Sequence, residues 1–345
     1  RSNMNNLKKL GLSALAASMA ATTASATEYA VTGDAILKYA SIDDPTGAET
    51  ASGKGIGVDT DLYFNASGEL DNGFTVAFFQ AANTDGAWTN SSSQVTIGMG
   101  SMGTLQINNI AGAKANGIDD VMPFAYEETW DSTDGTVHRA DFFGASTASG
   151  SVDYRIPAQE MMGLTINASV TLDPNSDVGS TTAGGPGAST VSGTAYTLQL
   201  AHESGLEIGG GFEEMDMQNA QVSADGLSTT TGYIKYAAGG LTVAYQEAYQ
   251  DTANTGTASE PDKESEMFGI AYTAGDFTVS YADAEVTTKA SSTTAALATI
   301  ELTSIQAAYS MGAMTVSAAM SETDNENGVA AREYSENTLA VSFAF

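Results

Sequence analysis

The sequence predicts an all-β protein, a sixteen-stranded antiparallel transmembrane β-barrel with a long loop after the fifth strand. Three observations lead to this fold class. The last ten residues, Glu336 to Phe345, alternate apolar with small or polar side chains up to a final aromatic residue. Tight turns and longer polar loops then alternate along the whole chain. Finally, 36 glycines and only six prolines punctuate short apolar segments, which favours strands and turns.

The final segment is expected to close the sheet. One face of it is apolar: Leu339, Val341, Phe343 and Phe345. The other face is small or polar: Thr338, Ala340, Ser342 and Ala344. Soluble proteins rarely end on their most apolar stretch because chain ends fray in water, whereas the last strand of a barrel pairs with the first and faces lipid. An edge strand of a soluble sandwich is the alternative. However, the second face of the strands is polar, which suits a water-filled lumen better than a protein core.

Residues 1–26 are predicted to be a signal peptide with three extra residues before Met4. Lys8 and Lys9 precede an apolar stretch from Leu10 to Ala21, and Ala24-Ser25-Ala26 forms a small-residue cleavage site. The apolar stretch is too short to span a bilayer as a helix. The barrel is therefore expected to occupy 27–345, and the chain is expected to leave the cytoplasm.

The composition excludes several classes of function. The chain has no cysteine, which removes disulfide frameworks and thiolate zinc sites. Its formal charge is −30, and without the three basic residues of 1–26 the remainder has 9 basic against 42 acidic residues. Such a polyanion repels nucleic acid but can concentrate cations in a lumen. No later stretch is long enough for a transmembrane helix.

Alternation is visible from the first expected strand onward. There Val31, Ala35 and Leu37 face one way, while Asp34 and Lys38 face the other. After the second strand, Asn72-Gly73 supplies the positive φ that tight hairpins need. A turn from Pro157 to Gly163 is expected between the sixth and seventh strands. The expected strands are 29–39, 56–69, 74–83, 95–99, 105–110, 152–156, 164–172, 196–202, 206–212, 232–236, 241–249, 267–273, 277–286, 300–309, 314–320 and 336–345.

The long segment 111–149 interrupts this rhythm. Loops of such length in a compact fold usually have a function. Its acidic residues are candidate functional residues: Asp119, Asp120, Glu127, Glu128, Asp131 and Asp134. It also contains aromatic residues: Phe124, Tyr126, Trp130, Phe142 and Phe143. A loop exposed to solvent does not need these aromatic residues, whereas a loop folded against the inner wall needs them as anchors. The sequence therefore predicts that this segment lies inside the barrel.

Catalytic and metal-binding patterns are weak. His138 and His202 lie far apart in the strand order, so a shared catalytic triad is not expected and the chain is predicted not to be an enzyme. No cofactor is expected. Two acidic loop segments, Asp131-Ser-Thr-Asp134-Gly135 and Glu322-Thr-Asp324-Asn-Glu326, could hold Ca²⁺ or Mg²⁺ loosely, although solvated charge also explains them.

The signal peptide, the sixteen strands, the long third loop and the terminal Phe resemble the general porins of Gram-negative outer membranes. The opening Tyr29-Ala-Val-Thr-Gly-Asp is similar to the first strand of the alphaproteobacterial branch. The resemblance implies a homotrimer in the outer membrane with a third-loop constriction in each pore. It implies that Phe345 is the signal read by the barrel-assembly machinery. Outer-membrane lipid and lipopolysaccharide are the other expected partners.

The chain departs from this family at the pore wall. General porins often place arginines in strands two to four, opposite the loop acids, but these strands contain no Lys or Arg here. The expected wall residues are the acids Asp59 and Asp61 and the bases Lys38, Arg155 and Lys235. Lys114 and Arg139 lie within the long segment itself. The transverse field of the family is therefore expected to be weak or rearranged.

The function that the sequence indicates is passive diffusion of small hydrophilic solutes and ions, with a preference for cations. Two alternatives remain. One is a substrate-selective porin, in which Tyr126, Trp130 and Tyr154 would form an aromatic slide for sugars. The other is a plugged barrel with a structural or adhesive role at the cell surface.

Overall fold

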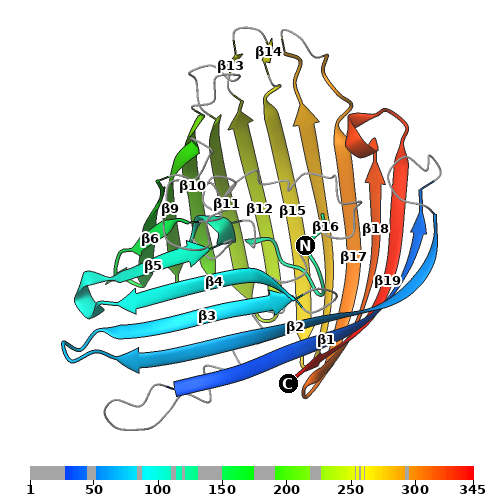
Figure 1. Ribbon diagram of the computed structural model, residues 1–345. Helices are drawn as coiled ribbons and strands as arrows, with labels where there is room; N and C mark the ends of the chain where they lie inside the picture. Colours follow the sequence, from blue (N-terminus) through cyan, green and yellow to red (C-terminus); the bar gives the residue numbers. More distant parts are fainter. Residues whose placement is uncertain are drawn as a thin grey trace.

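The chain forms one closed antiparallel barrel (Figure 1). This computed structural model describes residues 28–44, 52–83, 88–109, 114–118, 121–130, 150–174, 191–217, 227–252, 254–255, 258–259, 261–291 and 295–345. No helix within these ranges is long and apolar enough to cross a bilayer. The predicted fold class is confirmed, with a long connection after the fifth strand.

The strands alternate in direction, and each pairs with its neighbour in the chain. The first half of the wall contains β1 (Glu28–Asp43), β2 (Gly53–Glu69), β3 (Thr75–Asn83), β4 (Thr89–Gly98), β5 (Thr104–Asn109), β6 (Val152–Arg155), β7 (Gln159–Met161), β8 (Leu164–Asp173) and β9 (Val191–His202). The second half contains β10 (Leu206–Met217), β11 (Leu227–Ala238), β12 (Leu241–Asp251), β15 (Lys263–Ala274), β16 (Phe277–Thr288), β17 (Ile300–Met311), β18 (Met314–Asp324) and β19 (Glu333–Ala344). A small hairpin, β13 (Asn254–Thr255) and β14 (Ala258–Ser259), lies in the connection between β12 and β15.

The barrel closes between its first and last strands. In the β1–β19 ladder Leu37 lies opposite Val341. The last residue takes part, because the Phe345 N–H donates to the Gly33 carbonyl at 2.8 Å and Phe345 accepts from Gly33 N–H at 3.1 Å. Leu339 is 50% exposed on the outer face, while Ala340 is buried on the inner face. Both predicted faces of the terminal strand are confirmed.

The connection after β6 differs from the prediction. A turn was expected over the whole stretch from Pro157 to Gly163, but β7 continues the pairing with β8 that β6 begins. Proline has no N–H to give to the ladder, so Pro157 interrupts the strand without ending it. The turn itself is at Met162 and Gly163, both with positive φ. Segments β6 and β7 are therefore two parts of one strand, which makes sixteen strands in all.

Several strands are longer than the alternation indicated, mostly at the end next to the long loops. Strand β9 begins at Val191 rather than 196, and β15 begins at Lys263 rather than 267. Polar side chains occupy both faces at these ends, so hydrophobic periodicity gives no signal there. Strand β4 also begins early, and its register with β3 shifts between Ala81 and Ala82, which further weakens the pattern.

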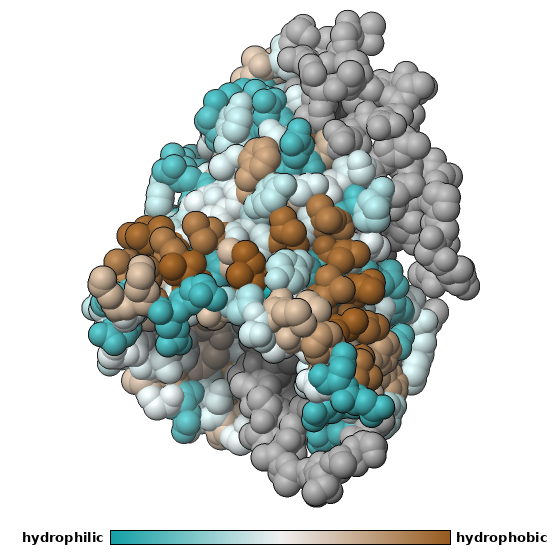
Figure 2. All heavy atoms as spheres, turned by 90° about the vertical axis from the view of Figure 1, so that its left-hand side faces the viewer, coloured by the Kyte–Doolittle hydropathy of each residue, from teal (hydrophilic) through white to brown (hydrophobic). Residues whose placement is uncertain are grey.

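The outer wall has an apolar belt next to the tight turns. Figure 2, which views the wall from the left of Figure 1, shows apolar side chains gathered in a band between hydrophilic regions. Aromatic residues mark the tight-turn edge of the belt on the second half of the wall: Tyr236, Tyr272, Phe277, Tyr309 and Phe345. This arrangement is the aromatic girdle of outer-membrane barrels.

Candidate pore constriction

The described parts of the long segment after β5, residues 114–118 and 121–130, fold into the barrel and pack against its inner wall. Five side chains of this segment are buried in one apolar cluster: Ala115, Ile118, Val121, Met122 and Trp130. Their partners on the wall are Ala195, Tyr233, Ala244, Ala248, Met267, Ala284, Val286, Ile300 and Leu302, which come from β9, β11, β12, β15, β16 and β17. The prediction that this segment lies inside the barrel is confirmed for residues 114–118 and 121–130, with Trp130 as an anchor. Phe142 and Phe143 lie outside the described residues.

Neutral side chains of the wall hold the backbone of this loop. Ser280 Oγ accepts from the Ala125 N–H at 2.8 Å. Gln306 Oε1 accepts from the N–H groups of Tyr126 and Glu127 at 2.8 and 3.1 Å, and its Nε2 donates to the Glu127 carbonyl at 2.5 Å. Ser280 and Gln306 lie directly opposite each other on β16 and β17. Together these two side chains accept hydrogen bonds from three consecutive N–H groups. We call the pair Ser280 and Gln306 the clip.

Two further contacts fix the rest of the loop. Gln246 Nε2 on β12 donates to the Ile118 carbonyl at 3.1 Å. Gly269 on β15 allows Pro123 to approach closely, since a Cβ at this glycine would lie 2.8 Å from the proline Cδ. A larger residue at 269 would therefore displace the loop from the wall. No sequence pattern identifies Gln246, Gly269, Ser280 or Gln306, because each is an ordinary inward residue of its strand.

Glu127 and Glu128 are buried, with exposed fractions of 2% and 3%. Lys38 on β1 lies 3.9 Å from the Glu127 carboxylate and 3.2 Å from that of Glu336 on β19. Glu336 also accepts hydrogen bonds from Tyr334 and Thr338. Lys38 therefore joins the loop to both strands of the closing seam. The sequence identified these charges but could not show that Glu127 and Lys38 meet.

A second group of acids lies on the inner face of β1 and β2. Asp34 is directly opposite Asp61, and Ile36 is directly opposite Asp59. The Tyr63 hydroxyl donates to Asp34 Oδ2 at 2.5 Å, and the Tyr63 ring stacks on Phe79 with centroids 6.2 Å apart. The expected wall residues Asp59 and Asp61 thus belong to a cluster that also contains Asp34, which the sequence analysis assigned only to the inner face.

The expected wall bases all have acidic partners. Arg155 Nε lies 2.6 Å from Asp153, and Thr171 also donates to this aspartate. Lys235 lies 3.0 Å from Glu207, which also accepts from Tyr233. Lys263 is an inward base that the sequence analysis missed. It alternates with the buried residues Ser265 and Met267, but the expected strand began only at Met267.

The other candidates do not converge on one site. Asp119, Asp120, Asp131, Asp134, His138 and Arg139 lie outside the described residues. Glu322 and Asp324 are exposed on β18, whereas Glu326 is buried with its carboxylate 3.9 Å from Arg332. His202 contacts only the tight turn, with Nδ1 2.9 Å from Ser204 Oγ. No group of three or more His, Cys, Asp or Glu side chains in the described ranges is arranged to hold a metal ion.

The three aromatic residues considered for a sugar slide do not line one path. Trp130 is buried in the apolar cluster between loop and wall. Tyr154 alternates with the buried inward residue Asp153 and so points outward, where its hydroxyl donates to the Met102 carbonyl at 2.7 Å. Tyr126 lies at the clip, where its backbone N–H donates to Gln306.

Comparisons with known proteins agree with this architecture. The family model described as Gram-negative porin matches residues 11–345. A search among curated proteins found no match. OmpF of Salmonella typhi, solved with daunomycin, is similar over 92% of this chain and 98% of its own, with a TM-score of 0.64 and 13% identity. An anion-selective porin from Comamonas acidovorans is similar over 93% of this chain and 100% of its own, with a TM-score of 0.64 and 11% identity.

A mutant porin of Rh. blastica is also similar, over 92% of this chain and 100% of its own, with a TM-score of 0.55 and 14% identity. These identities are low, so the solved structures establish the fold alone. The family model covers almost the whole chain, including every described strand. The closed barrel with an inward-folded loop after β5 agrees with this family match. The chain belongs to the Gram-negative porins, non-enzymatic diffusion channels of the outer membrane.

Proposed function

We propose that this porin passes small hydrophilic solutes and ions with a preference for cations. The proposal rests on one observation, the excess of acidic over basic residues on the inner wall. Inward-facing acids outnumber inward-facing bases on the described strands. The acids are Asp34, Asp59, Asp61, Asp153, Asp173, Glu207, Glu213 and Glu336, and the bases are Lys38, Arg155, Lys235 and Lys263. Three of these bases lie within 3.2 Å of a carboxylate oxygen, so their positive charge is locally offset.

A lumen with this excess of acids has negative potential, which concentrates cations and excludes anions. Charge on external loops is screened within about 10 Å at 0.1 M salt, so the loops contribute less than the narrow part of the pore. The constriction is proposed to lie between the inward-folded loop and the wall of β1 and β2. Its charge would come from the loop acids named above and from Asp59 and Asp61. Of these loop acids Glu127 and Glu128 are buried, and Asp119, Asp120, Asp131 and Asp134 lie outside the described residues.

The test is the reversal potential of single channels across a tenfold KCl gradient. The wild type is expected to prefer K⁺, and the preference should weaken but persist at high salt. Asp59→Asn with Asp61→Asn should lower it more than Glu322→Gln with Asp324→Asn, which removes the same charge from the outer face of β18. A wild type that prefers Cl⁻ would overturn the proposal. The Comamonas porin, whose name describes it as anion-selective, shows that this fold alone does not set the sign.

The same recording separates the alternative functions. A plugged barrel would show no steady ohmic current. A substrate-selective porin would show current block by its sugar, although the separation of Trp130 and Tyr154 argues against an aromatic slide. The proposal also includes a homotrimer of the alphaproteobacterial type, for which the first-strand resemblance and the Rh. blastica likeness are the support. Cross-linking of the purified protein in lipid measures this directly.

A further inference from the structure

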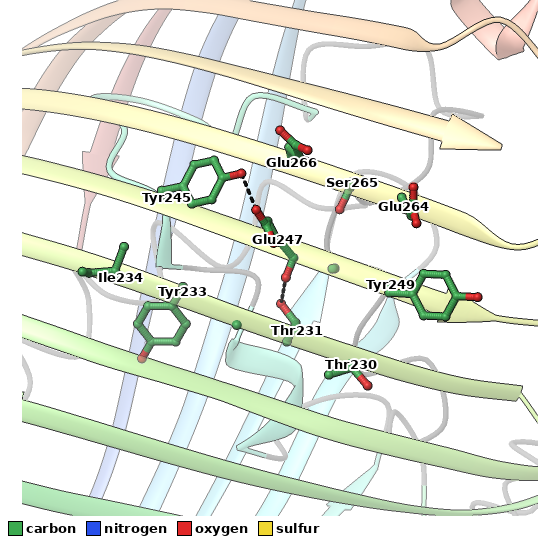
Figure 3. A pocket seen from close by; sticks show the side chains of 12 residues that line it. Thr230, Thr231, Tyr233, Ile234, Tyr245, Glu247, Tyr249, Glu264, Ser265 and Glu266 are labelled. Atoms are coloured by element: carbon green, nitrogen blue, oxygen red, sulfur yellow. Dashed lines mark hydrogen bonds between the residues drawn. The ribbon is translucent and has the colours of Figure 1, made fainter. Parts of the chain in front are cut away.

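A glycine on the inner wall makes room for an aromatic ring to lie flat under the inward-folded loop. Gly209 on β10 lies directly opposite Tyr233 on β11, and the two residues share the inner face of the wall. A Cβ atom at residue 209 would lie 2.5 Å from both Cζ and the hydroxyl oxygen of Tyr233. Figure 3 shows the ring of Tyr233 extending sideways from β11 toward the neighbouring strand. The ring therefore occupies the space that a side chain at residue 209 would need.

Glu207 and Lys235 hold the ring in this orientation. The Tyr233 hydroxyl donates to Glu207 Oε1 at 3.0 Å, and Glu207 lies two residues before Gly209 on the same face of β10. Lys235 Nζ lies 3.0 Å from the same oxygen and 6.0 Å from the centroid of the ring, which is within the range of a cation–π interaction. Both partners lie on the tight-turn side of Gly209, so they keep the ring turned along the wall.

Tyr233 is the first of a row of buried residues on the inner wall. Each member lies directly opposite the next on the neighbouring strand: Tyr233, Gln246, Met267, Ala284 and Leu302. The loop covers this row, because Gln246 donates to the Ile118 carbonyl at 3.1 Å and the other four members belong to the apolar cluster between loop and wall.

On the other side of Gly209 the same row becomes accessible. Gln199 lies directly opposite Gly209, and Asn167 lies directly opposite Gln199. Both side chains are polar and partly exposed, and the Asn167 amide donates to Gln199 Oε1 at 3.2 Å. The Tyr233 ring thus lies at the boundary between the loop-covered part of the row and its solvent-accessible part.

We propose that Gly209 is a positioning residue of the pore. By letting the Tyr233 ring lie flat, it sets how close the loop lies to the wall and hence how wide the free lumen beside the loop is. A Cβ at residue 209 would displace the ring by roughly 1 Å or more, because carbon atoms in contact are normally about 3.5–4.0 Å apart. Ala115 and Ile118 of the loop are buried, with exposed fractions of 0% and 6%, so close packing passes this displacement to the loop. The loop then protrudes into the lumen, and only smaller solutes pass.

The inference rests on membership of a family of diffusion channels and not on the ion preference of the pore. The experiment measures single-channel conductance in lipid bilayers and the size of the largest polyethylene glycol that enters the pore. Gly209→Ala is expected to lower the conductance and to exclude polymers that the wild type admits. Gly57→Ala is the matched control. It adds the same methyl group to the inner face of β2, opposite Lys38, where no atom lies within 4 Å of the new Cβ. Unchanged conductance in Gly209→Ala, or an equal loss in Gly57→Ala, would overturn the proposal.

A double substitution tests whether the ring transmits the effect. With Tyr233→Ala in place the new methyl group has no ring to displace, so adding Gly209→Ala should leave the conductance at the value of Tyr233→Ala alone. A further loss in the double variant would assign Gly209 to the strand itself and contradict the proposal. Tyr233→Phe keeps the ring over Gly209 and should retain the wild-type polymer limit. Heat-modifiable mobility on gels reports folding. Should Gly209→Ala fail to fold, the proposal requires the double variant to fold, and failure of both would overturn it.

Discussion

Next to the tight turns, β15, β16 and β17 face the membrane with Tyr272, Phe277 and Tyr309, but next to the long loops the same outer face has Glu266, Glu285 and Glu301. The inner face changes in the opposite sense. Beyond polar residues such as Gln306 it becomes apolar toward the loops, where Met267, Val286 and Leu302 are almost fully buried. Each strand keeps its period of two while its polarity inverts halfway along.

Both halves of the inversion have a physical reason. The inner apolar residues pack against the inward-folded loop, which gives that part of the wall a dry core instead of a wet lumen. The outer carboxylates form a row in which each member lies directly opposite the next: Glu247, Glu266, Glu285, Glu301, Asp324 and Glu333. The row leaves the belt as it crosses the strands, because its members are progressively farther from the tight turns. The polarity of each face of the barrel wall therefore depends on what covers it at that height, whether lipid, water or the inward-folded loop.

A substitution in the apolar cluster between loop and wall is expected to cause the largest loss of stability. Leu302→Ala should destabilise the barrel by about 2–5 kcal/mol, since the loop cannot collapse into the cavity that the lost side chain leaves. Urea unfolding in lipid vesicles measures this cost. The control is Ile305→Ala, which removes a side chain from the outer face of the same strand, where lipid can fill the space. Equal costs at both positions would mean that the loop does not pack on β17.

A new charge distinguishes the two outer regions. Val341→Arg in the belt should cost about 2–4 kcal/mol near the membrane midplane. Thr303→Arg should cost little or stabilise the barrel, because Thr303 lies opposite Asp283 and Glu322 in its two ladders. The same unfolding assay compares the two variants. If both substitutions cost the same, the belt extends as far as Thr303 on β17. Ser342→Arg, on the inner face, should also cost much less than Val341→Arg.

Removing the clip is expected to have a smaller effect, confined to the inward-folded loop. Gln306→Ala removes three hydrogen bonds to loop residues 126 and 127, each contributing about 1 kcal/mol. Hydrogen exchange of the amides at 125–127 should become faster, and single-channel current should become noisier as the loop moves. Gln250→Ala is the matched control, because Gln250 donates to Thr229 on the neighbouring strand and contacts no described residue of the loop. Unchanged exchange in Gln306→Ala would show that the apolar cluster alone holds the loop.

The sequence was sufficient for the strand order, for the tight turns other than the one after β7, and for the faces of β1 and β19, because local alternation determines these features. The sequence was not sufficient for features that depend on long-range contacts, such as the burial of a side chain under the loop. Leu302 and Val286 face inward only because a loop from elsewhere in the chain covers them. Glu127 is visible as a loop acid, but its burial depends on contacts with Lys38 and Gln306, more than 80 residues away in the chain. Lys263 was missed because its strand loses its apolar period before it ends.

The smallest predicted effect tests the carboxylate row itself. Glu285 lies opposite Glu266 on one side and Glu301 on the other, so its charge is repelled from two directions. Glu285→Gln should therefore stabilise the barrel by about 0.2–1 kcal/mol at low salt. The gain should shrink as ionic strength rises, because salt screens exposed charges. Glu214→Gln is the control, since Glu214 lies opposite Thr194 and Ser228 and has no acidic neighbour in its ladders. An equal gain from Glu214→Gln would show that the benefit comes from lower net charge rather than from the register of the row.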